Sequence, residues 1–491
     1  MKISPFAITI GIIYFINFIS IVITIFVERK KPLTATVWIF ILSLIPILGF
    51  LLYFVFGRNL RPNQKRIFRL KKEYDTVYNS WLIEEKYLLN NDDELFNDAN
   101  IAEYKDIIEM NINSNRSIYS QDNEVSIFTN GKDKYEALLK DIENAKETIN
   151  ILYFIIKNDT IGRKMVDLLT KKAKQGVEVR VLYDHIGSFH TPSRMFDKLK
   201  KAGGKVTRFF PLSFGTYCSI NYRNHRKIVV IDGSIGYVGG INIGDEYMGE
   251  AKGKYKKLRP WRDTHIRIVG TSVMFLQERF LMDWYYATKD ETVNEDNRLK
   301  KFFHNRGGKG KIGVQIVASG PDLTGEQIKM GYIKMINSAK DRVYLQTPYF
   351  IPDDSFLEAL KISAMSGVDV RMMLPLTPDK NFVYHATTSY IQDLLDYGIK
   401  VYLYKGFLHS KMVAVDGRIV SLGTANLDIR SFSLDFEINA FIYDTEFAEK
   451  CISIFEDDMK KSEIVTMEKY KARGTWNKTK EGFSRLFSPL L

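Results

Sequence analysis

The chain has 491 residues and a formal net charge of +12, and 45% of its residues are hydrophobic, which is enough for two or three domains with ordinary cores. Its two cysteines, Cys218 and Cys451, are far apart in the sequence, which argues against a disulfide framework and a cysteine-based zinc site. A basic chain suits an anionic partner, and composition alone does not separate a nucleic acid from an anionic membrane surface.

Two uncharged apolar segments open the chain, at residues 6–27 and 34–57, and each is long enough to cross a bilayer. Neither has a polar face, and the first is followed at once by the second. We therefore predict a transmembrane hairpin over residues 1–58 rather than a cleaved signal peptide. Pro46 and Gly49 interrupt the second segment, so both a kink and a re-entrant hairpin stay open there.

Positive charge predicts the orientation of this hairpin. Seven Lys and Arg residues lie between Arg58 and Lys72, against three at residues 29–31. The larger cluster favours the cytoplasmic side, so we expect a multi-pass protein of the plasma membrane whose remaining chain is cytoplasmic. A basic juxtamembrane linker is predicted over residues 59–115.

The central part of the chain holds two copies of one α/β pattern. Each copy reads strand, helix, Gly, strand, at residues 149–180 and again at 343–371. This order is typical of a mostly parallel sheet with helices on its faces. We predict a first half over residues 116–295 and a second over 313–465, joined by a charged, Gly-rich linker at 296–312.

Each half also carries the motif H-x-K-x4-D-x6-G-x-x-N. The copies are His225, Lys227, Asp232 and Asn242, and His409, Lys411, Asp416 and Asn426. Alternate side chains of a strand share a face, so the His and Lys of each copy point the same way. The apolar residues between Lys and Asp predict a buried strand, and the Asp-Gly pair predicts a tight turn after it. One copy would be weak support, but two copies with the same offsets indicate a common function.

Two such halves packed face to face would bring together two imidazoles, two lysines and two asparagines. This set can hold a tetrahedral phosphodiester, attack it and protonate the group that leaves. We assign His225, Lys227, Asp232, His409, Lys411 and Asp416 to the catalytic set, and Asn242 and Asn426 to substrate binding. The position of the two aspartates at turns favours a role in loop structure for them.

The last segment, residues 466–491, mixes aromatic and leucine side chains with lysines and an arginine. Its composition favours an amphipathic helix at a membrane interface, and an ordinary solvated helix is the alternative. Together with the apolar hairpin, this segment makes anionic membrane lipids the expected partner and a nucleic acid an unexpected one.

These motifs resemble those of the phospholipase D superfamily, and the surrounding sequence looks like its bacterial cardiolipin synthases. The resemblance covers nearly the full chain and is carried by residues 153–157, 224–227, 239–242, 261–263, 319–322, 347–350, 407–411 and 426–431. One departure is Gly240, because many members place Ser at that position. A hydroxyl contact is therefore in doubt at the first of the two corners.

The resemblance implies an α/β fold of two homologous α-β-α sandwich halves packed with pseudo-two-fold symmetry behind the hairpin. It also implies phosphatidyl transfer in the bacterial plasma membrane: one phosphatidylglycerol gives its phosphatidyl group to a second, through a phosphohistidine, yielding cardiolipin and glycerol. His225 is the expected nucleophile and His409 the expected acid and base, and near-symmetry leaves the reverse open. Asp263 in the first half and Glu437 in the second would each orient the histidine of its own half.

Several alternatives stay open at this point. A phospholipase D that releases phosphatidate, or another phosphatidyltransferase acting on membrane phospholipids, would use the same residues. A nuclease, or a membrane-anchored lipid-binding protein with a dead site, fits less well. We expect no metal and no other cofactor, because the lysines can supply the positive charge and the acidic residues lack metal-ligand spacing. Around the site, Arg430 and Ser431 are expected on the head-group side.

Overall fold

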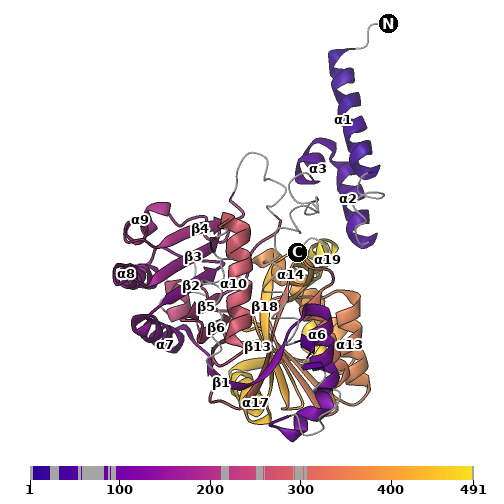
Figure 1. The fold of residues 1–491 in the computed structure, drawn as a ribbon. Coiled ribbons are helices and arrows are strands. Elements are labelled where there is room, and N and C mark those ends of the chain that lie inside the picture. Colours follow the sequence, from indigo (N-terminus) through magenta and orange to yellow (C-terminus); the bar gives the residue numbers. More distant parts are fainter. Residues whose placement is uncertain are drawn as a thin grey trace.

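The computed structural model describes residues 4–22, 32–53, 96–211, 221–249, 260–290 and 307–488, with single positions between these ranges. Apolar helices at the amino terminus project from a larger α/β body (Figure 1). Cys218, the basic cluster at residues 58–72 and the loop at residues 29–31 lie outside the described residues, as does most of the linker predicted between the halves.

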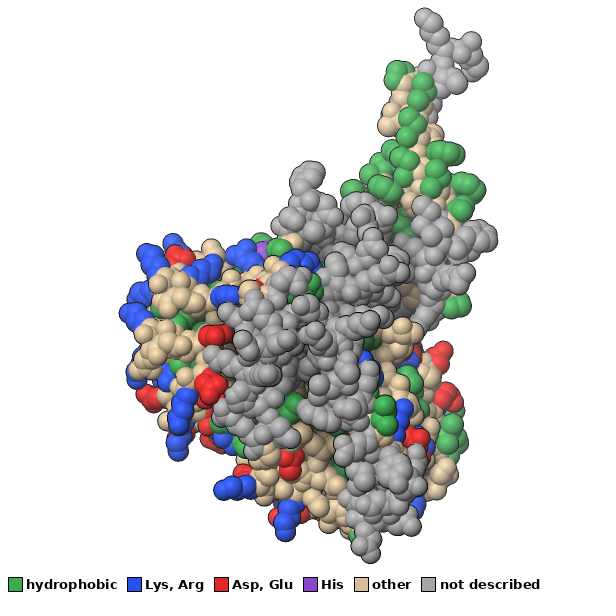
Figure 2. All heavy atoms as spheres, viewed as in Figure 1, with side chains coloured by type: hydrophobic (Ala, Val, Ile, Leu, Met, Phe, Trp, Pro, Cys, Tyr) green, Lys and Arg blue, Asp and Glu red, His purple; other side chains and the backbone are tan. Residues whose placement is uncertain are grey.

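Three helices form the amino-terminal part: α1 (Pro5–Val22), α2 (Pro32–Leu44) and α3 (Pro46–Leu52). The chain breaks between α2 and α3 at Ile45, next to Pro46, which has no N–H to continue the helical hydrogen bonds. Helix α1 is apolar around most of its surface, and Ile12, Phe15 and Phe18 are each more than half exposed (Figure 2). Within the described ranges, no helix combines the length and the hydropathy that a membrane span requires.

A single 15-stranded sheet runs through the α/β body. From its centre outwards, the first half contributes β1 (Tyr119–Phe128), β8 (His265–Val269), β6 (Ile235–Gly239), β5 (Ile228–Ile231), β2 (Thr148–Tyr153), β3 (Glu178–Asp184) and β4 (Lys205–Phe209). The second half contributes β9 (Ile312–Ser319), β18 (Glu437–Tyr443), β16 (Ile419–Gly423), β15 (Met412–Val415), β10 (Arg342–Gln346), β12 (Asp369–Pro375), β13 (Lys400–Tyr404) and β19 (Ser462–Val465). The two orders match strand for strand up to β4 and β13. Because β1 and β9 pair at the centre, the predicted duplication forms one continuous sheet.

The prediction of a mostly parallel sheet is wrong. Only β2–β3–β4 and β10–β12–β13 are parallel. Other neighbours in the sheet are antiparallel, including the motif hairpins β5–β6 and β15–β16. The reason is that the strand–helix–strand pattern covers only part of each half, whereas each Asp-Gly turn sends the chain straight back beside itself.

Helices cover both faces of the sheet, as an α-β-α sandwich requires. On one face, α10 (Val273–Thr288) and α17 (Thr445–Met459) pack on a hydrophobic core that runs across both halves. On the other face, α7 (Gly131–Asn144) and α8 (Thr160–Lys174) cover the first half. Helices α12 (Gln327–Asn337) and α13 (Asp354–Met365) cover the second half in the same way.

Part of the segment that we assign to the juxtamembrane linker belongs to this body. Residues 99–115 form η3 (Ala99–Tyr104) and α6 (Lys105–Asn115), and α6 packs in the core of the second half. The Asn111 amide donates to Gln315 Oε1 at 3.2 Å, which ties the helix to strand β9. Residues 99–115 are therefore part of the folded α/β body.

Candidate active site

Two short backbone contacts join the halves where the motif histidines lie. Strand β14 (Phe407–Leu408) pairs in parallel with β7 (Trp261–Arg262), and Asn224 forms an isolated bridge with Phe436. As a result, the His409 N–H donates to the Arg262 carbonyl oxygen at 2.6 Å, and the His225 N–H donates to the Phe436 carbonyl oxygen at 3.0 Å. Each histidine is thus fixed to the residue that precedes an acidic residue of the other half.

The side chains follow the backbone and pair across the halves. His225 Nδ1 lies 2.9 Å and 3.1 Å from the two carboxylate oxygens of Glu437, and His409 Nδ1 lies 2.7 Å from Asp263 Oδ2. Asp263 and Glu437 are the acidic residues that we expected beside the histidines, but each contacts the histidine of the other half rather than that of its own half. Because each Nδ1 faces a carboxylate, Nε2 is the nitrogen left for a substrate.

The two motif lysines are held alike. Lys227 Nζ donates to the His225 carbonyl oxygen, and Lys411 Nζ donates to the His409 carbonyl oxygen. Burial lowers the pKa of Lys227 to about 7 and the pKa of Lys411 to about 8. The carboxylates of Asp263 and Glu437 act in the opposite sense and raise both pKa values. Burial, followed by the charges of Lys227 and Lys411, lowers the pKa of His225 well below its usual value. Groups of both halves therefore act on one another within one site.

The two motif asparagines differ in how much of their amide the protein uses. Asn242 Oδ1 accepts the Ile155 N–H at 3.1 Å, and Asn242 Nδ2 donates to the Tyr247 hydroxyl at 2.8 Å. The buried Asn426 Oδ1 has no hydrogen-bond partner among the described residues. Asn242 thus ties together the loops of its half, whereas the side-chain oxygen of Asn426 is not engaged by the described residues.

The carboxylates of Asp232 and Asp416, which we assigned to the catalytic set, contact backbone N–H groups rather than the two motif histidines. The Asp232 carboxylate accepts the N–H groups of residues 146, 147 and 148, and the Asp416 carboxylate accepts those of residues 340, 341 and 342. Each aspartate follows a four-residue strand that begins next to the motif lysine, so it lies about 16 Å beyond that lysine along the extended chain. These carboxylates hold the loops at the far end of the motif strands, as their position at turns suggested.

The departure at Gly240 has a steric cause. A Cβ atom at Gly240 would lie 2.1 Å from Asp263 Oδ1, so no side chain fits while that carboxylate holds His409. The corresponding corner of the second half carries Thr424, whose hydroxyl donates to Glu437 Oε2. A hydroxyl contact therefore exists at the second corner, and the glycine excludes one at the first.

Sequence reasoning missed the residue between His225 and Lys227. Arg226 is fully buried, and its guanidinium lies 2.6 Å from Asp283 and donates to the Glu437 carbonyl oxygen at 3.1 Å. Strand alternation turns it to the face opposite the histidine, and a buried charge needs a partner, so the motif already contained this signal. Arg226 ties strand β18 to the first motif and so helps to place Glu437.

Aromatic rings surround the two imidazoles. The ring centroid of Phe154 lies 4.9 Å from that of His225. Phe407 and Trp261 lie 5.7 Å and 6.0 Å from His409. Such rings keep water away from the reacting atoms while leaving the charged groups in contact with one another.

Four other residues lie near the site. Arg262 is buried and pairs with Asp458 at 2.9 Å. Arg430 donates to the Asn221 backbone and also pairs with Asp435, and its neighbour Ser431 accepts the Asn426 N–H. His265 is buried beside Gly239, and neither nitrogen of its imidazole has a hydrogen-bond partner among the described residues.

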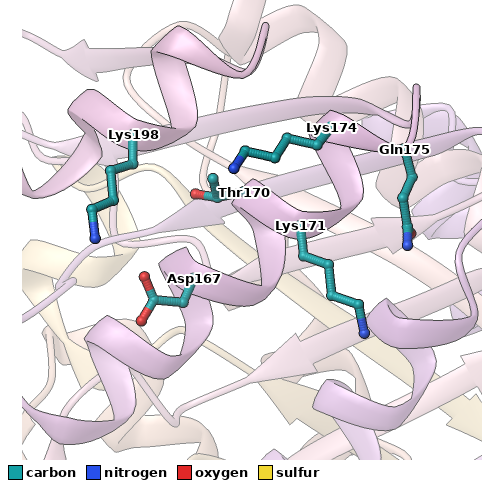
Figure 3. Close-up of a pocket in the computed structure, with 6 residues that line it drawn as sticks. All are labelled: Asp167, Thr170, Lys171, Lys174, Gln175 and Lys198. Carbon is teal, nitrogen blue, oxygen red and sulfur yellow. The ribbon is translucent and has the colours of Figure 1, made fainter.

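A separate surface depression of about 480 Å³ lies on α8 and the nearby helix α9 (Asp197–Lys201), and Figure 3 shows its lysine-rich lining. It is lined by Asp167, Thr170, Lys171, Lys174, Gln175 and Lys198. No motif residue contributes to this lining, so the depression is not part of the paired-histidine site.

Comparison with known proteins decides the family. Residues 138–252 and 332–459 match the family described as "Cardiolipin synthase, PLD-like domain", and residues 12–58 match "Phospholipase_D-nuclease N-terminal". The chain is 45% identical to the major cardiolipin synthase ClsA of Bacillus subtilis over 99% of both chains. It is 44% identical to a cardiolipin synthase of Oceanobacillus iheyensis over 98% of both chains.

The chain belongs to the cardiolipin synthase family of the phospholipase D superfamily. It is accordingly a phosphatidyltransferase. The crystal structure of phosphatidylserine synthase from Haemophilus influenzae has the same fold, with a TM-score of 0.58, 14% identity, and coverage of 79% of this chain and all of that one. The two-half fold expected from the motif is therefore confirmed.

Replacing Asp416 with Ala should destabilise the protein and spare its chemistry. The change leaves three backbone N–H groups without their acceptor, so we expect the free energy of unfolding to fall by about 1–3 kcal/mol. Denaturant unfolding and phosphatidyl transfer per folded molecule would measure the two effects. Normal stability with lost transfer would return Asp416 to the catalytic set.

Proposed function

We propose that the protein makes cardiolipin and glycerol from two molecules of phosphatidylglycerol at the membrane. The observation that carries the proposal is the pair of largely buried imidazoles, each held at Nδ1 by a carboxylate of the other half, with two lysines beside them. The identity of its relatives supports the choice of substrate. One phosphodiester replaces another, so the reaction needs no nucleotide.

In the first step, His225 Nε2 attacks the phosphorus atom of one phosphatidylglycerol. The bond from phosphorus to the glycerol oxygen breaks, and His409 gives its Nε2 proton to that oxygen, so glycerol leaves and a phosphohistidine remains. In the second step, His409 takes the proton of the free head-group hydroxyl of a second phosphatidylglycerol. That oxygen attacks phosphorus, the phosphorus–nitrogen bond breaks, and both histidines return to their starting states.

Electrostatics support His225 as the nucleophile and His409 as the acid. Burial and Lys411 lower the pKa of His409 to about 4, but Asp263 acts in the opposite direction and favours a proton on this ring. Burial and both motif lysines lower the pKa of His225 as well, so the carboxylate partners make the difference. Burial also raises the pKa of its partner Glu437 to about 7, so that carboxyl group carries less negative charge at neutral pH. His225 is thus the imidazole that more readily stays unprotonated.

Lys227, Lys411 and Asn426 would hold the non-bridging phosphate oxygens. These hydrogen-bond donors come from both halves, and they would stabilise the negative charge that grows on those oxygens in the transition state. A bound phosphodiester anion would in turn raise the lowered pKa values of the two lysines and of His409, because opposite charges stabilise each other strongly in a buried site.

We also propose the finer membrane arrangement: residues 1–58 form a transmembrane hairpin, and the catalytic body lies on the cytoplasmic side. The exposed apolar surface of α1 and the family match of residues 12–58 support the hairpin. The positive charge at residues 58–72 supports the orientation.

His225→Ala and His409→Ala should each reduce transfer from phosphatidylglycerol by at least about a thousandfold. A phosphatidyl ester of p-nitrophenol separates their roles, because nitrophenolate leaves without a proton. We expect His409→Ala to release one burst equivalent of nitrophenolate and to retain phosphorus on the protein, whereas His225→Ala gives no burst. The opposite pattern would exchange the two roles.

The value of kcat/KM should fall as the pH rises through about 7 to 8. The pKa values of Lys227 and Lys411 lie there, and each lysine binds phosphate only while protonated, below its own pKa. Replacing Lys227, which has the lower pKa, with Arg, which stays charged, should shift the start of this fall to about pH 8, where Lys411 titrates, even as it lowers the rate. A flat profile up to about pH 9 would remove the lysines from the charge balance.

Purified protein in phosphatidylglycerol vesicles should form cardiolipin and glycerol in equal amounts, as scored by thin-layer chromatography. EDTA should leave the rate unchanged, because the lysines supply the positive charge. Phosphatidate as the sole lipid product would favour the phospholipase D alternative, and an EDTA-sensitive rate restored by a divalent cation would contradict the metal-free mechanism.

A further inference from the structure

The last helix, α19 (Thr475–Leu486), turns polar side chains towards the protein. Glu481 and Ser484 are buried, and Glu481 Oε1 accepts the Thr388 hydroxyl at 2.9 Å. The Arg485 guanidinium reaches the carbonyl oxygen of Ser389 at 3.2 Å. Thr388 and Ser389 belong to α14 (Asn381–Ser389), so hydrogen bonds rather than an apolar core attach α19 to this helix.

The opposite side of α19 is apolar and faces outwards. Trp476, Phe483 and Leu486 are 68%, 58% and 69% exposed, and their spacing of seven and three residues places them on one side of the helix. The ring of Phe487 lies 5.9 Å from that of Phe382 on α14, which is also partly exposed and extends the patch. A solvated surface helix turns its apolar side chains to the core and its polar side chains to water. The exposed apolar side of α19 therefore suits contact with an apolar phase or partner.

Positive charge accompanies the apolar patch. Lys478 and Lys480 lie on α19, Lys380 is exposed directly before α14, and Lys480 Nζ lies 5.3 Å from the ring of Trp476. Aromatic and leucine side chains mixed with cations suit the interface of an anionic bilayer, where rings enter the head-group layer and ammonium groups meet phosphates. An apolar groove of a protein partner would leave those cations without counter-charges.

Helix α14 connects this patch to the active site. Asp379 accepts the Tyr349 hydroxyl at 2.6 Å, and its negative charge raises the pKa of Lys411. The positive charge of Lys380 lowers the pKa of His225. Helix α14 begins at the next residue. In Figure 1, α14, α19 and the carboxyl terminus lie at the end of the body from which the apolar amino-terminal helices project.

We propose that α19 and the start of α14 form a docking surface that seats the rim of the active site on an anionic phospholipid bilayer. A phosphatidylglycerol head group would then reach the histidines while its acyl chains stay in the membrane. The inference rests on the proposed function for the identity of the lipid substrate. The first experiment below measures insertion and does not depend on turnover, so the docking proposal and the proposed function can fail separately.

The first experiment uses the full chain in phosphatidylglycerol vesicles that contain nitroxide-labelled lipids. In a Cys218→Ser background, an environment-sensitive fluorophore is attached at Leu486→Cys or, as the control, at the exposed Lys450→Cys on α17, at the other end of the body (Figure 1). We expect several-fold stronger quenching at position 486. Equal quenching at both positions, or shielding at 486 that depends on protein concentration rather than on lipid, would overturn the proposal.

The second experiment removes the patch. Trp476→Ser, Phe483→Ser and Leu486→Ser together should lower transfer on vesicles by at least about tenfold and leave transfer of short-chain phosphatidylglycerol in detergent unchanged. A matched control replaces Ile362 and Met365 of α13 with Ser, because these apolar side chains are 54% and 64% exposed away from the patch. Loss on both substrates, loss on neither, or an equal effect of the control variant would each contradict a docking role.

Discussion

Each imidazole of the site depends on a carboxylate that the other half of the chain carries. Backbone hydrogen bonds from His225 to Phe436 and from His409 to Arg262 place Glu437 and Asp263 beside the opposite histidine. Neither half therefore contains a complete His–carboxylate pair. Two features hold the halves close enough for each carboxylate to reach the histidine of the other half. They are the continuous sheet through β1 and β9 and the pairing of β7 with β14. The fold thus makes the two motif copies a single active site.

The same arrangement buries several charged groups close together. Burial lowers the pKa values of Lys227 and Lys411 to about 7 and 8 and raises the pKa of Glu437 to about 7. Such burial works against folding, and a phosphodiester anion between the lysines offsets part of that cost. The halves are also unequal in detail, because Thr424 donates to Glu437 while Gly240 leaves room for Asp263. These differences distinguish the surroundings of the two near-symmetric histidines.

The sequence predicted what strand periodicity and turn chemistry determine. The two halves, the shared face of His225 and Lys227, and the Asp-Gly turns all follow from residue spacing. It could not predict which segments approach one another across the halves, so Glu437 was assigned to the wrong histidine. The strand–helix–strand pattern predicts parallel pairing, but it covers only part of each half, and the motif hairpins are antiparallel. The glycine at position 240 had no explanation until the position of the Asp263 carboxylate was known.

The central claim is that the histidine–carboxylate pairs cross between the halves. Pre-steady-state release of nitrophenolate from a phosphatidyl p-nitrophenyl ester tests it most directly, in Glu437→Gln and Asp263→Asn variants. Because Glu437 holds His225, Glu437→Gln should slow the burst itself. Because Asp263 holds His409, Asp263→Asn should leave the burst rate nearly unchanged and slow transfer to the second phosphatidylglycerol. A slow burst in Asp263→Asn with a normal burst in Glu437→Gln would contradict the crossed arrangement with His225 as the nucleophile.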